Sequence, residues 1–183
     1  MNYNVNGLSQ DQKKKISDGI TKYLEIQDLY KKCKNLNNLK APDCIDFQKK
    51  FNGFYKVRRN KNWRKEFYDL FEQNKNNKNI SFDDIYDELL KKTGKREKSF
   101  VSKLVHTINN DSPIIDQNVL RGLGIKGNNP IAIFNNLETE YKRTLLPDAK
   151  AQNFFNDFDT AFPKAKLISD VKKIDFYLWV LFA

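Results

Sequence analysis

The sequence predicts an all-α protein, folded as a single globular multi-helix domain over residues 1–183. Apolar residues recur at three- and four-residue steps along most of the chain, which is the period of one helix face. The seven glycines and five prolines are too few for the many turns of a β-sandwich. Fourteen Phe, eight Tyr and two Trp supply an aromatic core. A chain of this length buries roughly 70% of its unfolded surface, so it folds without cross-links.

The N-terminal third predicts a helical extension over residues 1–40, followed by a short helix. Ser9 is a suitable cap for a long first helix. The apolar positions of that helix follow helical steps: Ile16, Ile20, Tyr23, Leu24 and Cys33. After a polar break at 35–42, residues 43–51 predict a second helix, and Gly53 lies where a C-terminal glycine is expected.

The middle of the chain predicts three more helices. Trp63, Phe67, Leu70 and Phe71 share one helical face, and 74–79 is a polar loop. Ser81 and Asp84 resemble a capping box before an apolar stripe that ends near Gly94. A further helix begins near Ser99, with its inward positions at Phe100, Leu104, Val105 and Ile108.

The C-terminal part predicts four helices. Asp116 opens a short one, and the loop 122–130 holds three of the seven glycines. Three helices follow, around residues 131–145, 148–162 and 169–181. Asp175 is flanked by apolar residues and needs a partner if it is buried.

Cysteine and histidine usage points away from metal chemistry. Cys33 and Cys44 are eleven residues apart without a CxxC pair, and His106 is the one histidine. This set does not make a zinc site, so we expect no metal and no cofactor; a lone disulfide stays an open alternative. His106 lies off the predicted apolar stripe, and we assign it no role.

The sequence also predicts neither a targeting segment nor a membrane span. The N-terminus does not read as a signal peptide. The apolar run 176–183 is shorter than the about 20 residues that a span needs, so it predicts a buried terminal helix. We therefore expect a cytoplasmic protein without a membrane partner.

The positive charge is concentrated in the middle of the chain. Of the net +10, residues 48–103 carry +8, whereas residues 104–183 are neutral. Lysines that only solvate a surface would be spread more evenly. A localised basic face neutralises phosphates and releases counterions, so we expect a nucleic acid as partner, with double-stranded DNA the first choice.

Two basic segments are candidate contacts. Within 51–65, Arg58 and Arg59 stand among aromatic residues that would stack on bases or, alternatively, belong to the core. The second is the turn Gly94-Lys95-Arg96 before the helix at Ser99, because helix N-termini favour anions.

Residues 89–125 resemble the helix-hairpin-helix DNA glycosylase superfamily, which includes endonuclease III, and suggest a helix-hairpin-helix-like unit at 81–125. Gly94 resembles the first hairpin glycine, and Lys98-Ser99-Phe100 the start of the helix that follows. Residues 115–121 resemble the aspartate motif that ends in arginine, here Arg121. The resemblance implies base flipping, with Asp116 as catalytic carboxylate, Lys98 as candidate amine nucleophile eighteen residues earlier, and residues 94–98 on a phosphate.

Simpler interpretations of the same residues remain open. Asp116 is a good helix N-cap, Gly94 a helix C-cap, Lys98 a solvated or phosphate-contacting lysine, and Arg121 an ion-pair partner of a neighbouring acid. Arg96 also stands near the position of the second hairpin glycine. Alternative functions are therefore a DNA- or RNA-binding module without catalysis, and a helical protein that docks an acidic protein partner.

Overall fold

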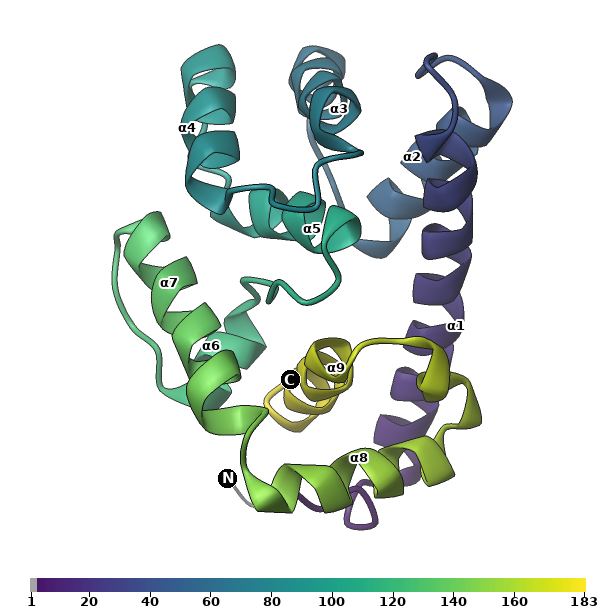
Figure 1. The fold of residues 1–183 in the computed structure, drawn as a ribbon, viewed down its shortest axis with the longest axis vertical. Coiled ribbons are helices and arrows are strands. Elements are labelled where there is room, and N and C mark those ends of the chain that lie inside the picture. Colours follow the sequence, from purple (N-terminus) through teal and green to yellow (C-terminus); the bar gives the residue numbers. More distant parts are fainter. Residues whose placement is uncertain (1–2) are drawn as a thin grey trace. The chain divides into compact units, whose positions relative to one another are not determined.

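The computed structural model describes residues 3–183 and confirms the all-α class. Nine α-helices make up most of these described residues, which contain no strand (Figure 1). In chain order they are α1 (Gln10–Lys34), α2 (Pro42–Phe54), α3 (Lys61–Asn74), α4 (Phe82–Thr93), α5 (Lys98–Ile108), α6 (Gln117–Leu123), α7 (Pro130–Glu140), α8 (Ala149–Ala161) and α9 (Asp170–Leu181). A π-helical turn, Tyr141–Leu145, follows α7, and a 3₁₀ turn, Pro163–Leu167, follows α8.

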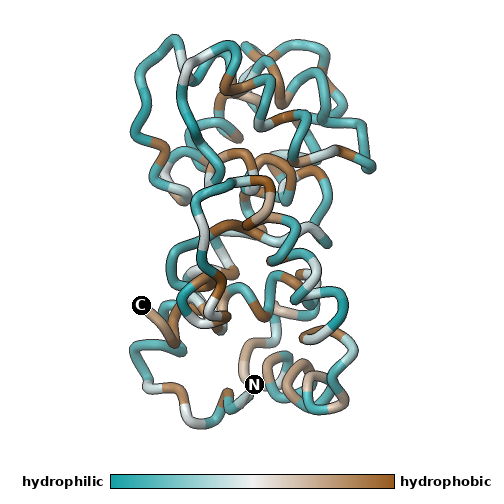
Figure 2. Tube along the Cα trace, turned by 90° about the vertical axis from the view of Figure 1, so that its left-hand side faces the viewer, coloured by the Kyte–Doolittle hydropathy of each residue, from teal (hydrophilic) through white to brown (hydrophobic). Residues whose placement is uncertain are grey.

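The helices group into two compact units. The first unit comprises Met1–Thr21 and Asn110–Ala183, and the second comprises Lys22–Asn109. Helix α1 contributes residues to both units, and the chain passes from the second unit back to the first after Asn109. Hydrophobic and hydrophilic residues are interspersed along the helices, as expected of amphipathic helices (Figure 2).

Several helices begin where the sequence predicts, at residues whose side chains cap the first turn. Ser9 accepts a hydrogen bond from the Gln12 N–H and its own N–H donates to the Gln12 side chain, a reciprocal capping box. Ser81 likewise accepts from the Asp84 N–H. The expectation that Gly53 follows the end of α2 is wrong, because this helix continues to Phe54.

The second unit has an aromatic core. Phe47 and Phe71 stack with ring centroids 4.9 Å apart, and Trp63 stacks on Phe67 at 5.0 Å. All four rings are buried, so the aromatic residues of α2 and α3 mainly stabilise the fold. Helix α4 packs against α3 and, across a short turn, against α5 (Figure 1).

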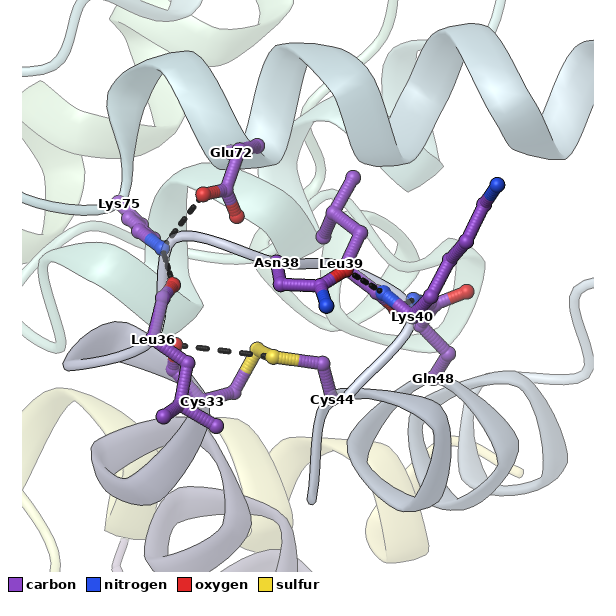
Figure 3. The surroundings of a disulfide bond; sticks show 9 residues. All are labelled: Cys33, Leu36, Asn38, Leu39, Lys40, Cys44, Gln48, Glu72 and Lys75. Carbon is purple, nitrogen blue, oxygen red and sulfur yellow. Dashed lines mark hydrogen bonds and ion pairs between the residues drawn. A yellow bond between two sulfur atoms is a disulfide. The ribbon is translucent and has the colours of Figure 1, made fainter. Parts of the chain in front are cut away.

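A disulfide between Cys33 and Cys44 joins the end of α1 to the start of α2, with Cα atoms 4.7 Å apart (Figure 3). Both cysteines are fully buried. The loop they close is also held by Lys75, whose Nζ donates to the Leu36 carbonyl, and by Gln48, whose side chain donates to the Leu39 carbonyl at 3.0 Å. Lys75 is itself buried and pairs with Glu72 at 2.6 Å. The open alternative of a disulfide is thus the observed state.

The first unit is built around α9. This helix packs against α6 and α8, and it is buried from Val171 to Leu178. Lys172 and Asp175 form a buried ion pair at 2.6 Å, which supplies the partner that Asp175 requires. A side chain at Gly122 would meet the Phe182 ring at 2.5 Å, so the close approach of α6 to the C-terminal segment depends on this glycine.

The helix predicted over residues 131–145 is divided. Helix α7 ends at Glu140, and π-helical hydrogen bonding begins at Tyr141. Tyr141 is fully buried, and burial raises its pKa well above that of a free tyrosine. The phenol is therefore neutral throughout the physiological range.

Candidate nucleic-acid interface

The turn between α4 and α5 is the most basic exposed element of the candidate site. Gly94 ends α4 in the left-handed conformation (φ 66°), and its N–H donates to the Leu90 carbonyl at 2.7 Å. This confirms Gly94 as a helix C-cap, a position that favours glycine because a Cβ is strained there. Lys95 and Arg96 follow, and both are exposed. Two cations are thus presented on a tight turn.

Helix α5 begins one residue earlier than predicted, at Lys98, and its N-cap is Glu97. The Glu97 carbonyl accepts from the N–H groups of Phe100 and Val101, each at 3.0 Å. Lys98 and Ser99 form the first turn, and both are half-buried. The head of α5 therefore combines a helix N-terminus, which favours anions, with a carboxylate of its own.

Arg59 neutralises that carboxylate. Its guanidinium donates to both Glu97 oxygens, from Nε at 2.6 Å and from Nη2 at 3.1 Å. The hydrogen bond to Glu97 raises the pKa of Arg59. The guanidinium also lies 5.3 Å from the Phe100 ring centroid. Arg58 is exposed, as Arg59 is, but it makes no contact with Glu97 in the described hydrogen bonds and ion pairs. Arg59 thus links the 51–65 segment to the head of α5.

Lys103 belongs to the same cluster, although the sequence analysis did not select it. It lies one turn after Ser99 on α5 and is buried, with its Nζ donating to the Ser99 hydroxyl. The rings of Tyr55 and Phe100 lie 5.6 Å and 5.5 Å from this Nζ. The Ser-to-Lys spacing of four was a usable signal, because residues i and i+4 share one helix face.

His106 is also buried, although it lies off the predicted apolar stripe of α5. Its Nε2 lies 3.0 Å from the Tyr23 hydroxyl, a contact across 83 residues of sequence. Every residue of α5 from Val101 to Thr107 is buried. Over this stretch α5 is buried on all sides, so four polar residues are buried together with the apolar ones: Ser102, Lys103, His106 and Thr107.

Asp116 caps α6. Its Oδ1 accepts from the Asn118 N–H at 2.9 Å, and the side chain is half-buried after the buried segment Pro113–Ile115. The simpler interpretation of Asp116 as an N-cap is thus confirmed for its structural role. Catalysis by the same carboxylate stays a prediction.

Arg121 stabilises the packing of α6 on the C-terminal segment. Its Nη1 donates to the Phe182 carbonyl at 2.7 Å, while the Asn118 side chain donates to the Trp179 carbonyl at 3.3 Å. The contact of Arg121 is therefore a helix-end carbonyl rather than the predicted acidic neighbour.

The predicted site residues are divided between the two units. Gly94, Lys95, Arg96, Lys98 and Ser99 lie together in the second unit with Arg58 and Arg59, whereas Asp116 and Arg121 lie in the first. Residues 89–125 thus cross the boundary between the two units after Asn109.

The first unit contains a shallow hollow of about 390 Å³ beside the end of α6. Gly124 and Lys126 from the α6–α7 loop line it, with Asn136, Thr139 and Glu140 from α7. Gly124 caps α6 in the left-handed conformation (φ 66°). Gly124, Ile125 and Lys126 of this lining belong to the glycine-containing loop that the sequence predicts at residues 122–130.

Comparison of the chain with protein-family models, curated proteins and solved structures finds no match. Within residues 3–183, no group of three or more histidine, cysteine or acidic side chains is arranged to hold a metal ion. In the same described residues, no helix is both long and apolar enough to cross a bilayer.

Proposed function

We propose that this protein binds nucleic acid, with double-stranded DNA as its main partner, through the α4–α5 turn. The observation that carries the proposal is the exposed Lys95–Arg96 pair at the head of α5, within the part of the chain that holds most of the net positive charge. We include Lys98, Ser99 and Arg58 among the proposed phosphate contacts. Phosphate oxygens are the ligands that such a surface favours.

A salt titration tests the binding proposal. We expect affinity for a duplex, followed by fluorescence anisotropy, to fall linearly with log salt concentration. The double variant Lys95→Gln/Arg96→Gln should lower this slope by about 2, since each lost phosphate contact removes roughly 0.9. The matched control is Lys14→Gln/Lys15→Gln, which removes two exposed charges from α1. Equal slopes for the two double variants would refute the assignment to the turn.

The reaction we propose for this protein is cleavage of an N-glycosidic bond of a flipped base. The resemblance of residues 89–125 to helix-hairpin-helix glycosylases supports it, with Asp116 as the carboxylate that stabilises positive charge on the sugar. Lys98 is then the amine that attacks the sugar. Duplexes with uracil, alkylated, oxidised or mismatched bases provide the substrate panel.

Asp116→Asn is a clean control for this reaction. Asparagine caps helices about as well as aspartate, so the variant keeps α6 and loses the negative charge. Base release by the native chain that disappears in Asp116→Asn supports catalysis. No release above this variant on any duplex refutes it and favours the second candidate, a binding module without catalysis, which the capping role of Asp116 supports.

A cytoplasmic location is part of the proposal, and the disulfide provides its test. Disulfides persist in oxidising compartments and are rare in the cytosol. Rapid lysis directly into denaturant with an alkylating reagent, followed by mass spectrometry, reads the state of the buried Cys33 and Cys44 in the cell. We expect both thiols to be alkylated in a cytosolic protein, and a quantitatively oxidised pair would refute that location.

A further inference from the structure

The contact between Ser99 and Lys103 joins a hydroxyl to an amine on one face of α5. The Lys103 Nζ donates to the Ser99 Oγ, and both residues belong to the second unit. A serine becomes a nucleophile when a base lies within hydrogen-bond reach of its hydroxyl. This geometry is the first requirement of such a pair.

The surroundings of Lys103 are the second observation. Only 8% of the residue is exposed, and the ring centroids of Tyr55 and Phe100 lie 5.6 Å and 5.5 Å from its Nζ. The π faces attract an ammonium and fix its position. Burial leaves little room for water to hydrate the amine. The amine is thus held in place and kept away from bulk solvent.

The position of Ser99 is the third observation. It is the second residue of α5 and is half-buried, whereas Lys103 lies behind it in the interior. The positive end of the helix stabilises negative charge that develops on the Oγ during attack. A reactant that approaches the α4–α5 turn therefore meets the hydroxyl before the amine.

We propose that Ser99 and Lys103 form a nucleophile–base pair that acts on phosphate esters. Lys95 and Arg96 on the adjoining turn favour an anionic substrate over a neutral one. When Lys103 has lost one proton, its neutral amine accepts the Ser99 hydroxyl proton and the Oγ attacks phosphorus. The Oγ–P bond forms, the bond from phosphorus to the ester oxygen breaks, and the proton passes from Lys103 to the leaving alkoxide.

This inference goes beyond nucleic-acid binding and uses neither Asp116 nor Lys98. A small fluorophosphonate tests it, because its phosphorus accepts the serine oxygen and releases fluoride without any need for bound DNA. Peptide mapping then identifies the labelled serine. We expect Ser99 to be labelled and Ser81 to stay unlabelled, although Ser81 also stands at the head of a helix, where its Oγ accepts from the Asp84 N–H.

Two variants at Lys103 distinguish a general base from a side chain with a structural role alone. Lys103→Arg keeps the charge and the aromatic contacts, yet arginine does not release its proton in proteins. We expect both Lys103→Arg and Lys103→Met to slow labelling about a hundredfold, the usual contribution of a general base. Labelling of Ser99 no faster than that of Ser81, or full-rate labelling of Lys103→Arg, would overturn the inference. Neither result depends on DNA binding, which the anisotropy titration measures separately.

Discussion

Opening the Cys33–Cys44 disulfide is expected to lower stability by an amount that follows from the size of its loop. The two cysteines are eleven positions apart. Cross-linking a loop of that length removes conformational entropy from the unfolded chain worth about 3 kcal/mol at room temperature. For a chain of this size, each kcal/mol shifts the melting temperature by roughly 2–4 °C, so the oxidised protein should melt roughly 6–12 °C higher.

The native state contributes little to this difference. Both cysteines are fully buried, and a free cysteine packs as a small apolar side chain. The bonds from Lys75 and Gln48 to the loop carbonyls involve neither sulfur, so they persist after reduction. The effect should therefore arise mainly in the unfolded chain.

Thermal and urea unfolding followed by circular dichroism measures the effect. The protein is reduced in denaturant, because buried sulfurs are protected in the folded state, and it is then refolded with and without reductant. The variant Cys33→Ala/Cys44→Ala serves as control and should not respond to reductant. Equal melting temperatures of the oxidised and reduced native chain would refute the loop argument.

Three further perturbations have defined outcomes. Glu97→Gln removes the carboxylate from the head of α5 and releases Arg59. Duplex affinity in the anisotropy titration should then rise about two- to fivefold, the size of a charge effect at a helix end. Unchanged affinity would contradict a phosphate contact at the head of α5. Burial raises the pKa of Tyr30 to about 12, so the folded state holds the phenolic proton more tightly than the unfolded state does. The stability that this proton contributes should be complete below about pH 10 and should fall as the pH rises toward 12. Urea midpoints across this range should fall less in Tyr30→Phe than in the native chain. Asp175→Ala leaves the Lys172 charge buried without its carboxylate and should cost about 3–5 kcal/mol of unfolding free energy, a loss that the apolar double variant Lys172→Met/Asp175→Leu should largely recover.

Local signals predicted the helices well. Ser9 and Ser81 cap their helices through neighbours only three residues away, so the chemistry needed to place them lies within a short window. Gly94 ends α4 for an equally local reason, its left-handed conformation. Gly53 misled because a glycine near a helix end does not by itself terminate the helix, and α2 extends through it to Phe54.

The contacts that define the candidate site are non-local, and this limited their prediction. Arg59 and Glu97 meet across 38 residues, and Tyr23 and His106 across 83. No short window contains both partners of either pair. Lys103 was missed because it occupies a buried helix whose polar residues are satisfied by such partners, so its burial depends on the assembled unit rather than on the periodicity of α5.

The course of the chain through its two units also governs the order in which they form during synthesis. Residues 22–109 are contiguous, so all their contacts are available as soon as that stretch has left the ribosome. The other unit unites the first 21 residues with residues from Asn110 onward. Its N-terminal segment must wait through the translation of 88 intervening residues, at roughly 5–20 residues per second. The second unit, which contains the basic turn, therefore has its whole sequence available before the first unit does.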